Sequence, residues 1–480
     1  MSSSISLGKK IGFWSATSII IGSIIGSGIF MKPASMAAQL GSPVWLILVW
    51  VIAGMFTLFG ALIYAELGAM IPETGGLYTY FRKMFGDFAA FLYGWAAFAV
   101  INTTAVAAIS FVCAQYADYF LHLPSFDPLT ELSVKWHIPF LGDLYPLKNF
   151  GVKCLGIFLV LVFTLLNYFS TKAGSAFQVV STFVKVAVLF LLVFAIFISG
   201  NGVFQNFITT EHPKRGGELL SGIIAAMTGA FFAYDGWNNI TSIAGEVKAP
   251  QKNIPRSLFL GVSACIAVYI LVNLAYLYAL PVEKIATSSL VATDAMNVVL
   301  GASAGAVVAA MIVICTMGAI NGNTMATTRI TYAMGKDKIF LPWAGKETRR
   351  FQTPGNALWL HGIWTCFFII TGSFDMLADI MVFMTWIAYG LGAVGIFILR
   401  RKMAGLERPY KIWKHPFVTL FFIAFTFFFL VVTIYNDINN YNNGTQPVIN
   451  SLLGLVITAI GIPFYYYYRR KNKKRIGVYH

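Results

Sequence analysis

Apolar stretches of about 20 residues recur along the whole chain, and short polar segments separate them. We count twelve such stretches, at about 12–38, 44–71, 88–121, 151–170, 176–199, 218–244, 258–281, 302–333, 357–372, 376–400, 416–436 and 448–468. A helix needs roughly 20 apolar residues to cross the hydrocarbon core of a bilayer. The pattern therefore predicts an all-α polytopic membrane protein with twelve transmembrane helices.

The first apolar stretch is interrupted near its centre, where residues 26–30 read GSGIF. Two glycines and a serine weaken a helix at the depth where hydrocarbon normally enforces one. Unpaired backbone groups are tolerated at that depth only where they line a cavity or contact a ligand. The interruption predicts a helix broken near the bilayer midplane, which is typical of a secondary transporter.

The sixth stretch is interrupted at the corresponding place, where residues 232–238 read FAYDGWN. Stretches 1–5 and 6–10 then form two halves of five helices. Because five is odd, the halves enter the membrane from opposite sides and form a 5+5 inverted repeat with broken helices 1 and 6. The predicted organisation is a ten-helix transport core over 1–400 (repeats about 12–199 and 218–400), two peripheral helices over 401–468 and a basic tail over 469–480.

The two breaks imply a binding chemistry. Free N–H groups at the start of the second half-helix, near Ser27 and Gly28, suit a carboxylate. Free carbonyls near Ile24, Phe232 and Ala233 suit an ammonium. A site with both poles is suited to an α-amino acid.

Composition and charge agree with a membrane location. Charged residues make up 11% of the chain, against about 25% in soluble domains. With the N-terminus in the cytoplasm, 25 of the 34 Lys and Arg residues lie on the cytoplasmic side and 7 on the other, and Lys185 and Arg329 lie within spans. This asymmetry predicts a multi-pass protein of the plasma (inner) membrane with both termini cytoplasmic. The basic tail fits anionic lipid better than nucleic acid.

The sequence contains no signature of a cofactor or an enzyme. Its five cysteines lie in or beside apolar stretches and lack metal-ligand spacing, so we expect no metal and interpret them as packing residues. Walker A, GxGxxG, HExxH and GxSxG motifs are absent, so neither ATP-driven transport nor hydrolysis is indicated.

Several segments together resemble the amino acid–polyamine–organocation (APC) superfamily, especially its L-amino-acid transporter branch and bacterial relatives. They are 22–30 (GSIIGSGIF), 64–76 (YAELGAMIPETGG), 232–238, 245–255 (GEVKAPQKNIP) and 407–411 (ERPYK). The resemblance implies the leucine-transporter fold, with ten core helices and two peripheral ones.

The resemblance also implies roles for individual residues. The substrate carboxylate would meet the amides of Ser27 and Gly28, and the amine would meet carbonyls at the two breaks. Phe232 is placed like the aromatic gate that covers a bound amino acid. The candidate substrate-binding residues are Ile24, Ser27, Gly28, Ile29, Phe232, Ala233 and Asp235, and the candidate coupling and gating residues are Lys185 and Phe232.

Lys185 lies within the fifth stretch, where a charge costs about 2.5–3.5 kcal/mol. It matches the lysine that sodium-independent members of the superfamily carry there, so its ammonium is expected at the cation position between spans 1, 5 and 8. The alternative is a lysine that reaches the cytoplasmic interface. A buried Lys185 would also be able to carry a coupling proton.

Asp235 allows two interpretations. Its carboxylate either faces the substrate side chain, as in family members that accept cationic amino acids and cystine, or caps the second half of span 6. The sequence leaves both open.

The predicted function is sodium-independent secondary transport of L-amino acids, mainly neutral ones, by alternating access and exchange. The alternatives are proton-coupled symport and exchange that accepts cationic amino acids through Asp235. The loop at 122–150 contains no cysteine. Since animal relatives attach an accessory glycoprotein by a disulfide from that loop, no disulfide-linked accessory subunit is expected.

Overall fold

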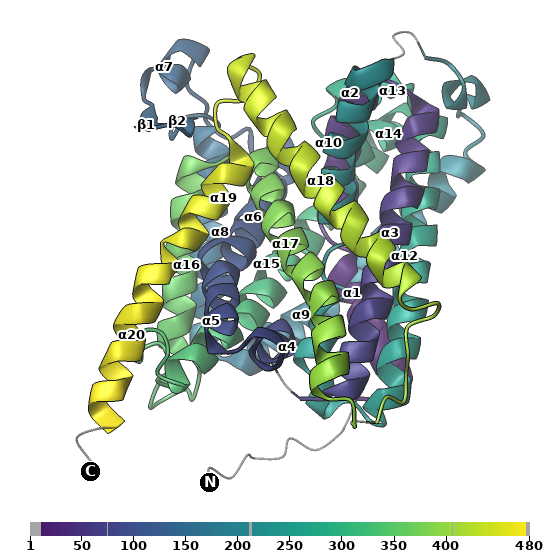
Figure 1. Cartoon of the computed structure of the whole chain (residues 1–480). Coiled ribbons are helices and arrows are strands. Elements are labelled where there is room, and N and C mark those ends of the chain that lie inside the picture. Colours follow the sequence, from purple (N-terminus) through teal and green to yellow (C-terminus); the bar gives the residue numbers. More distant parts are fainter. Residues whose placement is uncertain (1–10, 74, 211–213, 406, 477–480) are drawn as a thin grey trace.

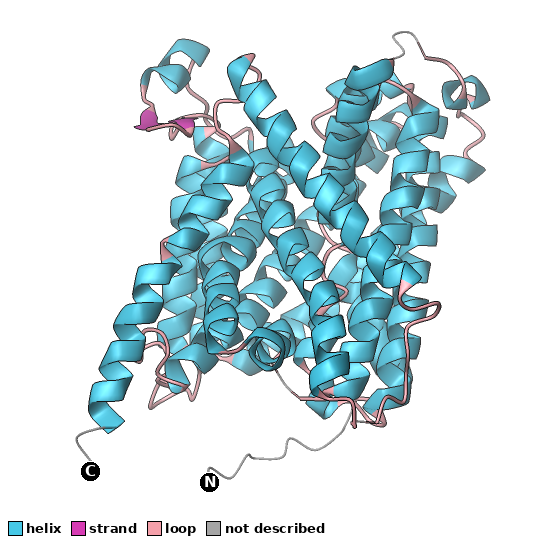
Figure 2. Ribbon diagram, viewed as in Figure 1, coloured by secondary structure: helices cyan, strands magenta, loops and turns pink. Residues whose placement is uncertain are grey.

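The computed structural model describes residues 11–73, 75–210, 214–405 and 407–476. These residues form a bundle of helices (Figure 2). Two short strands, β1 (Trp136–Ile138) and β2 (Gly142–Leu144), pair antiparallel in a loop at one end of the bundle. The all-α class expected from the hydrophobic pattern is confirmed.

Ten helices in the described ranges are long and apolar enough to cross a membrane. They are α3 (Pro43–Met70), α5 (Asp87–Ala96) continued through η1 (Ala97–Asn102) and α6 (Thr103–Leu121), α8 (Phe150–Phe169), α9 (Thr171–Ile198), α10 (Gly216–Tyr234), α12 (Pro250–Ala279), α15 (Ala302–Lys336), α17 (Phe374–Lys402), α18 (Phe417–Asn442), and α19 (Asn450–Ala459) with α20 (Gly461–Ile476).

The remaining two expected stretches are also helical. The first forms a bent pair, α1 (Phe13–Ile24) and α2 (Gly28–Leu40), which counts as an eleventh candidate span. The ninth forms α16 (Gly355–Thr371), which has 17 residues and packs against α8 and α6. A straight span takes roughly 20 residues, so α16 is not counted among the eleven candidates, and the twelfth span stays a prediction.

Short helices occupy the two ends of the bundle (Figure 1). The helix α4 (Gly76–Phe85) lies at the end where α1 begins, and α7 (Pro128–Ser133) lies with the strands at the opposite end. Further short segments connect the spans: α11 (Asn239–Ser242), α13 (Val282–Thr287), α14 (Val291–Leu300), and the 3-10 turns η2 (Phe204–Phe207) and η3 (Ala244–Glu246). We call the end with β1 and β2 the outer end, because the charge distribution predicts that it faces away from the cytoplasm.

Burial separates central helices from peripheral ones. In the span Asp87–Leu121, 89% of the most apolar window is buried, whereas the figure is 28% for α18 and also for Asn450–Lys471. The last two spans have the smallest buried shares of the ten, and their role as helices peripheral to a ten-helix core stays a prediction. The exact limits of the two repeats stay a prediction.

An ion pair ties α3 to α17 at the end opposite the strands. The Glu66 carboxylate, 1% exposed, accepts hydrogen bonds from Arg400 Nε (2.9 Å) and Nη2 (2.8 Å) and from the backbone N–H of Ile412 (2.9 Å). Arg408 donates to the Met403 carbonyl at 2.9 Å. Two charged residues of the resembling segments thus hold spans and their connecting loop together.

Candidate functional site

The first break matches the sequence prediction closely. The helix α1 ends at Ile24, Ile25 is extended, and α2 begins at Gly28 with its axis turned by 45°. Ser27 occupies the N-cap position without a capping side-chain hydrogen bond. Among the described residues, the amides of Ser27 and Gly28 have no hydrogen-bond acceptor. The break therefore presents two free donors at a helix N-terminus, where the dipole favours an anion.

The second break differs in detail from its prediction. The helix α10 ends at Tyr234, one residue beyond the expected Phe232 and Ala233. Asp235 is extended and Gly236 has φ +105°, a conformation that glycine adopts readily and L side chains rarely adopt. In place of a second half-helix, one turn follows, α11.

The two breaks touch each other through glycines. A Cβ on Gly28 would lie 2.6 Å from Ala233 Cα, and one on Gly236 would lie 2.6 Å from the Ser23 carbonyl oxygen. Gly26 is different, because a Cβ there would meet nothing closer than the Ile24 carbonyl oxygen at 3.7 Å. Gly28 and Gly236 are thus required for packing, whereas Gly26 borders unfilled space.

A tyrosine that the sequence analysis missed joins the two carbonyl ends. The Tyr269 hydroxyl on α12 lies 2.8 Å from the Ile24 carbonyl oxygen and 3.1 Å from that of Ala233. The Phe232 carbonyl accepts from the Asp235 N–H at 3.4 Å. Buried tyrosine hydroxyls normally find a partner, so a tyrosine in a predicted span was a signal, but nothing in the sequence identified the partner.

Lys185 reaches α1 from α9. Its side chain is buried, and its ammonium lies 3.3 Å from the Gly22 carbonyl oxygen. The helix α9 also packs along α15. The lysine therefore lies where spans 1, 5 and 8 meet rather than at a membrane interface.

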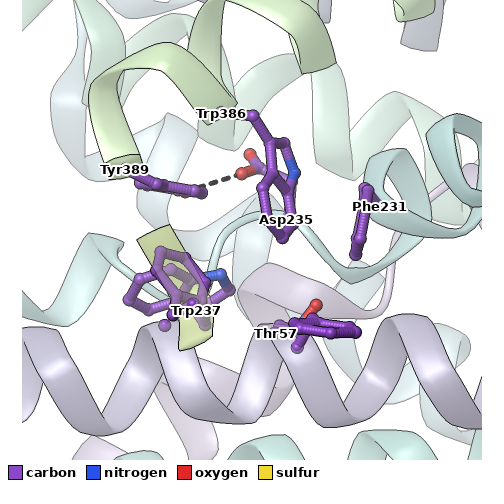
Figure 3. A pocket seen from close by; sticks show the side chains of 9 residues that line it. Thr57, Phe231, Asp235, Trp237, Trp386 and Tyr389 are labelled. Atoms are coloured by element: carbon purple, nitrogen blue, oxygen red, sulfur yellow. Dashed lines mark hydrogen bonds between the residues drawn. The ribbon is translucent and has the colours of Figure 1, made fainter. Parts of the chain in front are cut away.

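The Asp235 carboxylate points toward Tyr389 of α17 (Figure 3). It accepts a hydrogen bond from the Tyr389 hydroxyl at 2.8 Å, and that hydroxyl also accepts from Asn238 Nδ2 at 2.9 Å. The N-cap of α11 is Asn238, so Asp235 does not cap that turn. The pocket around the carboxylate lies between α10, α3, α17 and α18, and its lining is Phe56, Thr57, Gly60, Phe231, Asp235, Trp237, Trp386, Tyr389 and Phe422.

Phe232 lies in the last turn of α10, next to the break. It is 8% exposed and meets Phe374 edge-on, with ring centroids 5.7 Å apart. Ser27, the N-cap of α2, and Ile29, in the first turn of α2, are both buried. The structure thus brings Ile24, Gly28 and Ala233 together at the break, and the Asp235 carboxylate bonds Tyr389 of α17. In the ranges described, His, Cys, Asp and Glu side chains form no group that would hold a metal ion.

The arrangement offers hydrogen-bond donors and acceptors at a break between half-helices, within a multi-pass bundle. This combination is typical of a secondary transporter. Comparison with known proteins agrees, because the family model for amino acid permeases matches residues 11–461. The chain belongs to the amino acid permease family and is a transporter rather than an enzyme.

Individual relatives extend over most of the chain. It is 29% identical over 471 residues to the serine/threonine exchanger SteT of Bacillus subtilis (strain 168), covering 97% of this chain and 98% of the relative. It is 30% identical over 409 residues to the human b(0,+)-type amino acid transporter 1, covering 85% and 79%. It is 29% identical over 483 residues to the human large neutral amino acids transporter small subunit 2, covering 98% and 82%. The resemblance to the APC superfamily is confirmed.

Proposed function

We propose that this protein is a sodium-independent exchanger of L-amino acids, mainly neutral ones, that works by alternating access. The proposal rests on one observation. The unbonded amides of Ser27 and Gly28 and the carbonyls of Ile24 and Ala233 lie at the same break, so that one ligand would meet both sets of groups. An amino acid presents a carboxylate and an ammonium a few ångströms apart, and the two helix ends suit these two charges.

Lys185 supports independence from sodium. Its ammonium bonds the Gly22 carbonyl, near the C-terminal end of α1, where the helix dipole favours a cation. A fixed ammonium there supplies the positive charge that a bound ion would otherwise supply. Spans 1 and 5 are then held together without sodium.

Neutral substrates and exchange have separate support. The Asp235 carboxylate already has a partner in the Tyr389 hydroxyl, inside a pocket lined by α3, α10, α17 and α18, and this supports neutral substrates. SteT is named as a serine/threonine exchanger, and both its substrates are neutral. The b(0,+)-type relative leaves cationic amino acids as the alternative.

The test is exchange in proteoliposomes. Purified protein is loaded with unlabelled L-serine, and uptake of labelled L-serine is measured against a panel of twenty amino acids, with sodium or choline outside. We expect strong trans-stimulation by neutral amino acids and equal rates in both salts. A strong sodium dependence would contradict the role of Lys185, and competition by L-serine methyl ester equal to that of L-serine would contradict the two-pole site.

Proton-coupled symport is a second candidate, because the only hydrogen bond of the buried Lys185 ammonium among the described residues is the one to Gly22. Such an ammonium has little compensation, which makes Lys185 the candidate coupling residue of a symporter. An inward proton gradient without internal amino acid distinguishes the two: a symporter accumulates substrate under these conditions, and an exchanger does not.

We also propose that the protein works without a disulfide-linked subunit. The loop before α8 contains no cysteine, although Cys154 in the first turns of α8 is exposed. Two relatives, by contrast, are animal transporters, and one is named as a small subunit. Electrophoresis of membranes with and without reductant tests this, since a disulfide-linked partner would shift the 52.8 kDa band only without reductant.

A further inference from the structure

A group of exposed basic and aromatic side chains lies outside the site described above, at the end of the bundle opposite the strands. It consists of Lys411, Trp413 and Lys414, in the loop between α17 and α18, and Phe417, the first residue of α18. We call this group the loop patch. All four side chains are exposed, Trp413 by 65% and Phe417 by 75%. Exposed aromatic side chains that gather in this way mark a surface for interaction.

The residue in the middle of the loop patch ties it to the bundle. Ile412 is 4% exposed, and its backbone N–H donates to the Glu66 carboxylate of α3 at 2.9 Å. Since Ile412 is buried, the exposed side chains of Lys411 and Trp413 on either side of it are directed outward. The loop patch is thus built on a fixed stretch of the loop.

The loop patch carries positive charge without a countercharge. The Lys414 ammonium lies 4.7 Å from the ring centroid of Trp413. In the described part of the chain, no carboxylate pairs with Lys411 or Lys414. Residues 403–416 include three basic side chains and one acidic one, so the formal charge of the loop is +2 with histidine neutral. An anion is therefore the complementary partner, and the aromatic rings favour one that also offers apolar surface.

The loop patch lies where an apolar helix surface meets a polar loop. Figure 1 shows the loop running along the outside of the bundle from the lower end of α17 to the lower end of α18. Beyond Phe417 the exposed side chains in the first turn of α18 are apolar, with Leu420 exposed by 51% and Phe421 by 57%. Tryptophan is enriched at membrane–water interfaces, and basic side chains on the cytoplasmic side attract anionic headgroups. One lipid molecule is able to meet both surfaces.

We propose that the loop patch binds the headgroup of an anionic phospholipid, in the leaflet that the charge distribution predicts to be cytoplasmic. Lys411 and Lys414 contact the phosphate, and Trp413 lies at the level of the glycerol. Phe417 contacts the acyl chains. Each lysine near an anionic surface contributes a gain in affinity of about fivefold, so the two lysines favour charged over neutral lipid.

Binding at this place also affects the bundle. Through Ile412 the loop is bonded to α3, and through Arg408, which donates to the Met403 carbonyl at 2.9 Å, it is bonded to the end of α17. Glu66 of α3 in turn accepts two hydrogen bonds from Arg400 of α17. A lipid that fixes the loop therefore stabilises the contact between α3 and α17, since a ligand that binds only the folded state stabilises that state.

Tryptophan quenching tests the proposal independently of transport. Purified protein is reconstituted in phosphatidylcholine vesicles with increasing fractions of brominated phosphatidylglycerol or brominated phosphatidylcholine, whose bromines quench a tryptophan on contact. The difference between the wild type and Trp413→Phe isolates the signal of Trp413 among the 11 tryptophans. We expect half-maximal quenching of Trp413 at a fraction of phosphatidylglycerol about fivefold or more below that of phosphatidylcholine.

Charge variants decide whether the lysines cause this preference. Lys411→Gln/Lys414→Gln should bring the two quenching curves within twofold of each other, and Lys411→Arg/Lys414→Arg should keep them apart. The matched control Lys248→Gln/Lys252→Gln removes the same charge at the same end, beside no exposed large hydrophobic side chain, and should also keep them apart. Equal quenching by both lipids in the wild type would overturn the proposal, as would a preference that survives Lys411→Gln/Lys414→Gln. Loss of the preference on addition of inorganic phosphate would assign the loop patch to a soluble anion and would overturn it too.

Thermal unfolding in detergent tests the link to the bundle. Added phosphatidylglycerol should raise the melting temperature of the wild type by about twice as much as that of Lys411→Gln/Lys414→Gln, or more, and added phosphatidylcholine should not separate the two. Glu66→Ala keeps both lysines but removes the hydrogen bond to Ile412, so its response to phosphatidylglycerol should fall to half or less. An undiminished response of Glu66→Ala would show that the lipid does not act through the loop contacts, and would overturn the effect on the bundle.

Discussion

Two glycines of the first break should differ in how the same substitution affects stability. In Gly28→Ala the new methyl would lie 2.6 Å from Ala233 Cα, a backbone atom that cannot move aside, so α2 and α10 must separate. Overpacking of this kind costs about 1–3 kcal/mol. In Gly26→Ala the methyl finds its nearest neighbour at 3.7 Å, an ordinary contact, and φ is not in the left-handed region.

Gly26→Ala should therefore lose transport without losing stability. Gly26→Ala should fold as well as the wild type or gain about 0.4–1 kcal/mol, since alanine restricts the unfolded chain. Its methyl nevertheless enters space that the proposed substrate needs, so we expect L-serine exchange to fall at least tenfold, which corresponds to about 1.4 kcal/mol. Gly28→Ala should lose both stability and exchange.

The assays are thermal unfolding in detergent and exchange in proteoliposomes, on the same preparations. Normal exchange by Gly26→Ala would refute the assignment of the substrate to this break. Equal loss of stability in both variants would show that Gly26 has a packing role that its surroundings do not indicate.

Three further variants test other contacts. Lys185→Ala should reduce exchange at least tenfold while the protein still inserts, and normal exchange would argue that the α1–α9 contact is dispensable. Glu66→Ala should lower the free energy of unfolding by about 2 kcal/mol, less than the 3–5 kcal/mol of a fully buried pair because Arg400 is 26% exposed, and an unchanged melting temperature would contradict this. Asp235→Asn should leave competition by arginine and by alanine unchanged, because the amide oxygen still accepts a hydrogen bond from Tyr389. A selective loss of competition by arginine would instead indicate that Asp235 contacts the substrate.

The sequence predicts the spans and the first break well because both depend on local composition. Apolar stretches of about 20 residues report membrane crossing directly, and GSGIF marks the end of α1 and the start of α2 within a residue. The second break was placed a residue early and given a longer following helix. The positive φ of Gly236 and its approach to Ser23 explain the short turn, and both depend on how the breaks pack.

Contacts between distant segments were not predictable from residue type. Tyr269 bonds a carbonyl 245 positions away, and Lys32 bonds a carboxylate 343 positions away. Asp235 bonds Tyr389, 154 positions along the chain, and neither interpretation of Asp235 from the sequence named that partner. In each case the polar side chain signals that a partner exists, and only the fold supplies its identity.

Carbonyl groups of α1 and α2 have tyrosine partners that the amides at the break lack, and this difference leads to a last prediction. Tyrosine hydroxyls donate hydrogen bonds to the carbonyls. The Tyr269 hydroxyl lies 2.8 Å from the Ile24 carbonyl oxygen, and the Tyr276 hydroxyl lies 3.4 Å from that of Ile29. The Ile29 carbonyl would otherwise pair with the N–H of residue 33, which is a proline and has none. The amides of Ser27 and Gly28 have no hydrogen-bond acceptor among the residues that the structure describes.

At the proposed site a ligand carboxylate would therefore satisfy amides that have no other partner among the described residues, whereas its ammonium would add to hydrogen bonds that the carbonyls already make. Hydrogen bonds to a charged group contribute about 1.5–3 kcal/mol each. Loss of the carboxylate should accordingly weaken binding more than loss of the amine. L-alaninol, which lacks the carboxylate, should compete with labelled L-alanine at least tenfold more weakly than L-lactate, which lacks the amine. If L-lactate is the weaker competitor, the carbonyl end is the dominant pole, and Tyr269 must then move aside to admit the ammonium.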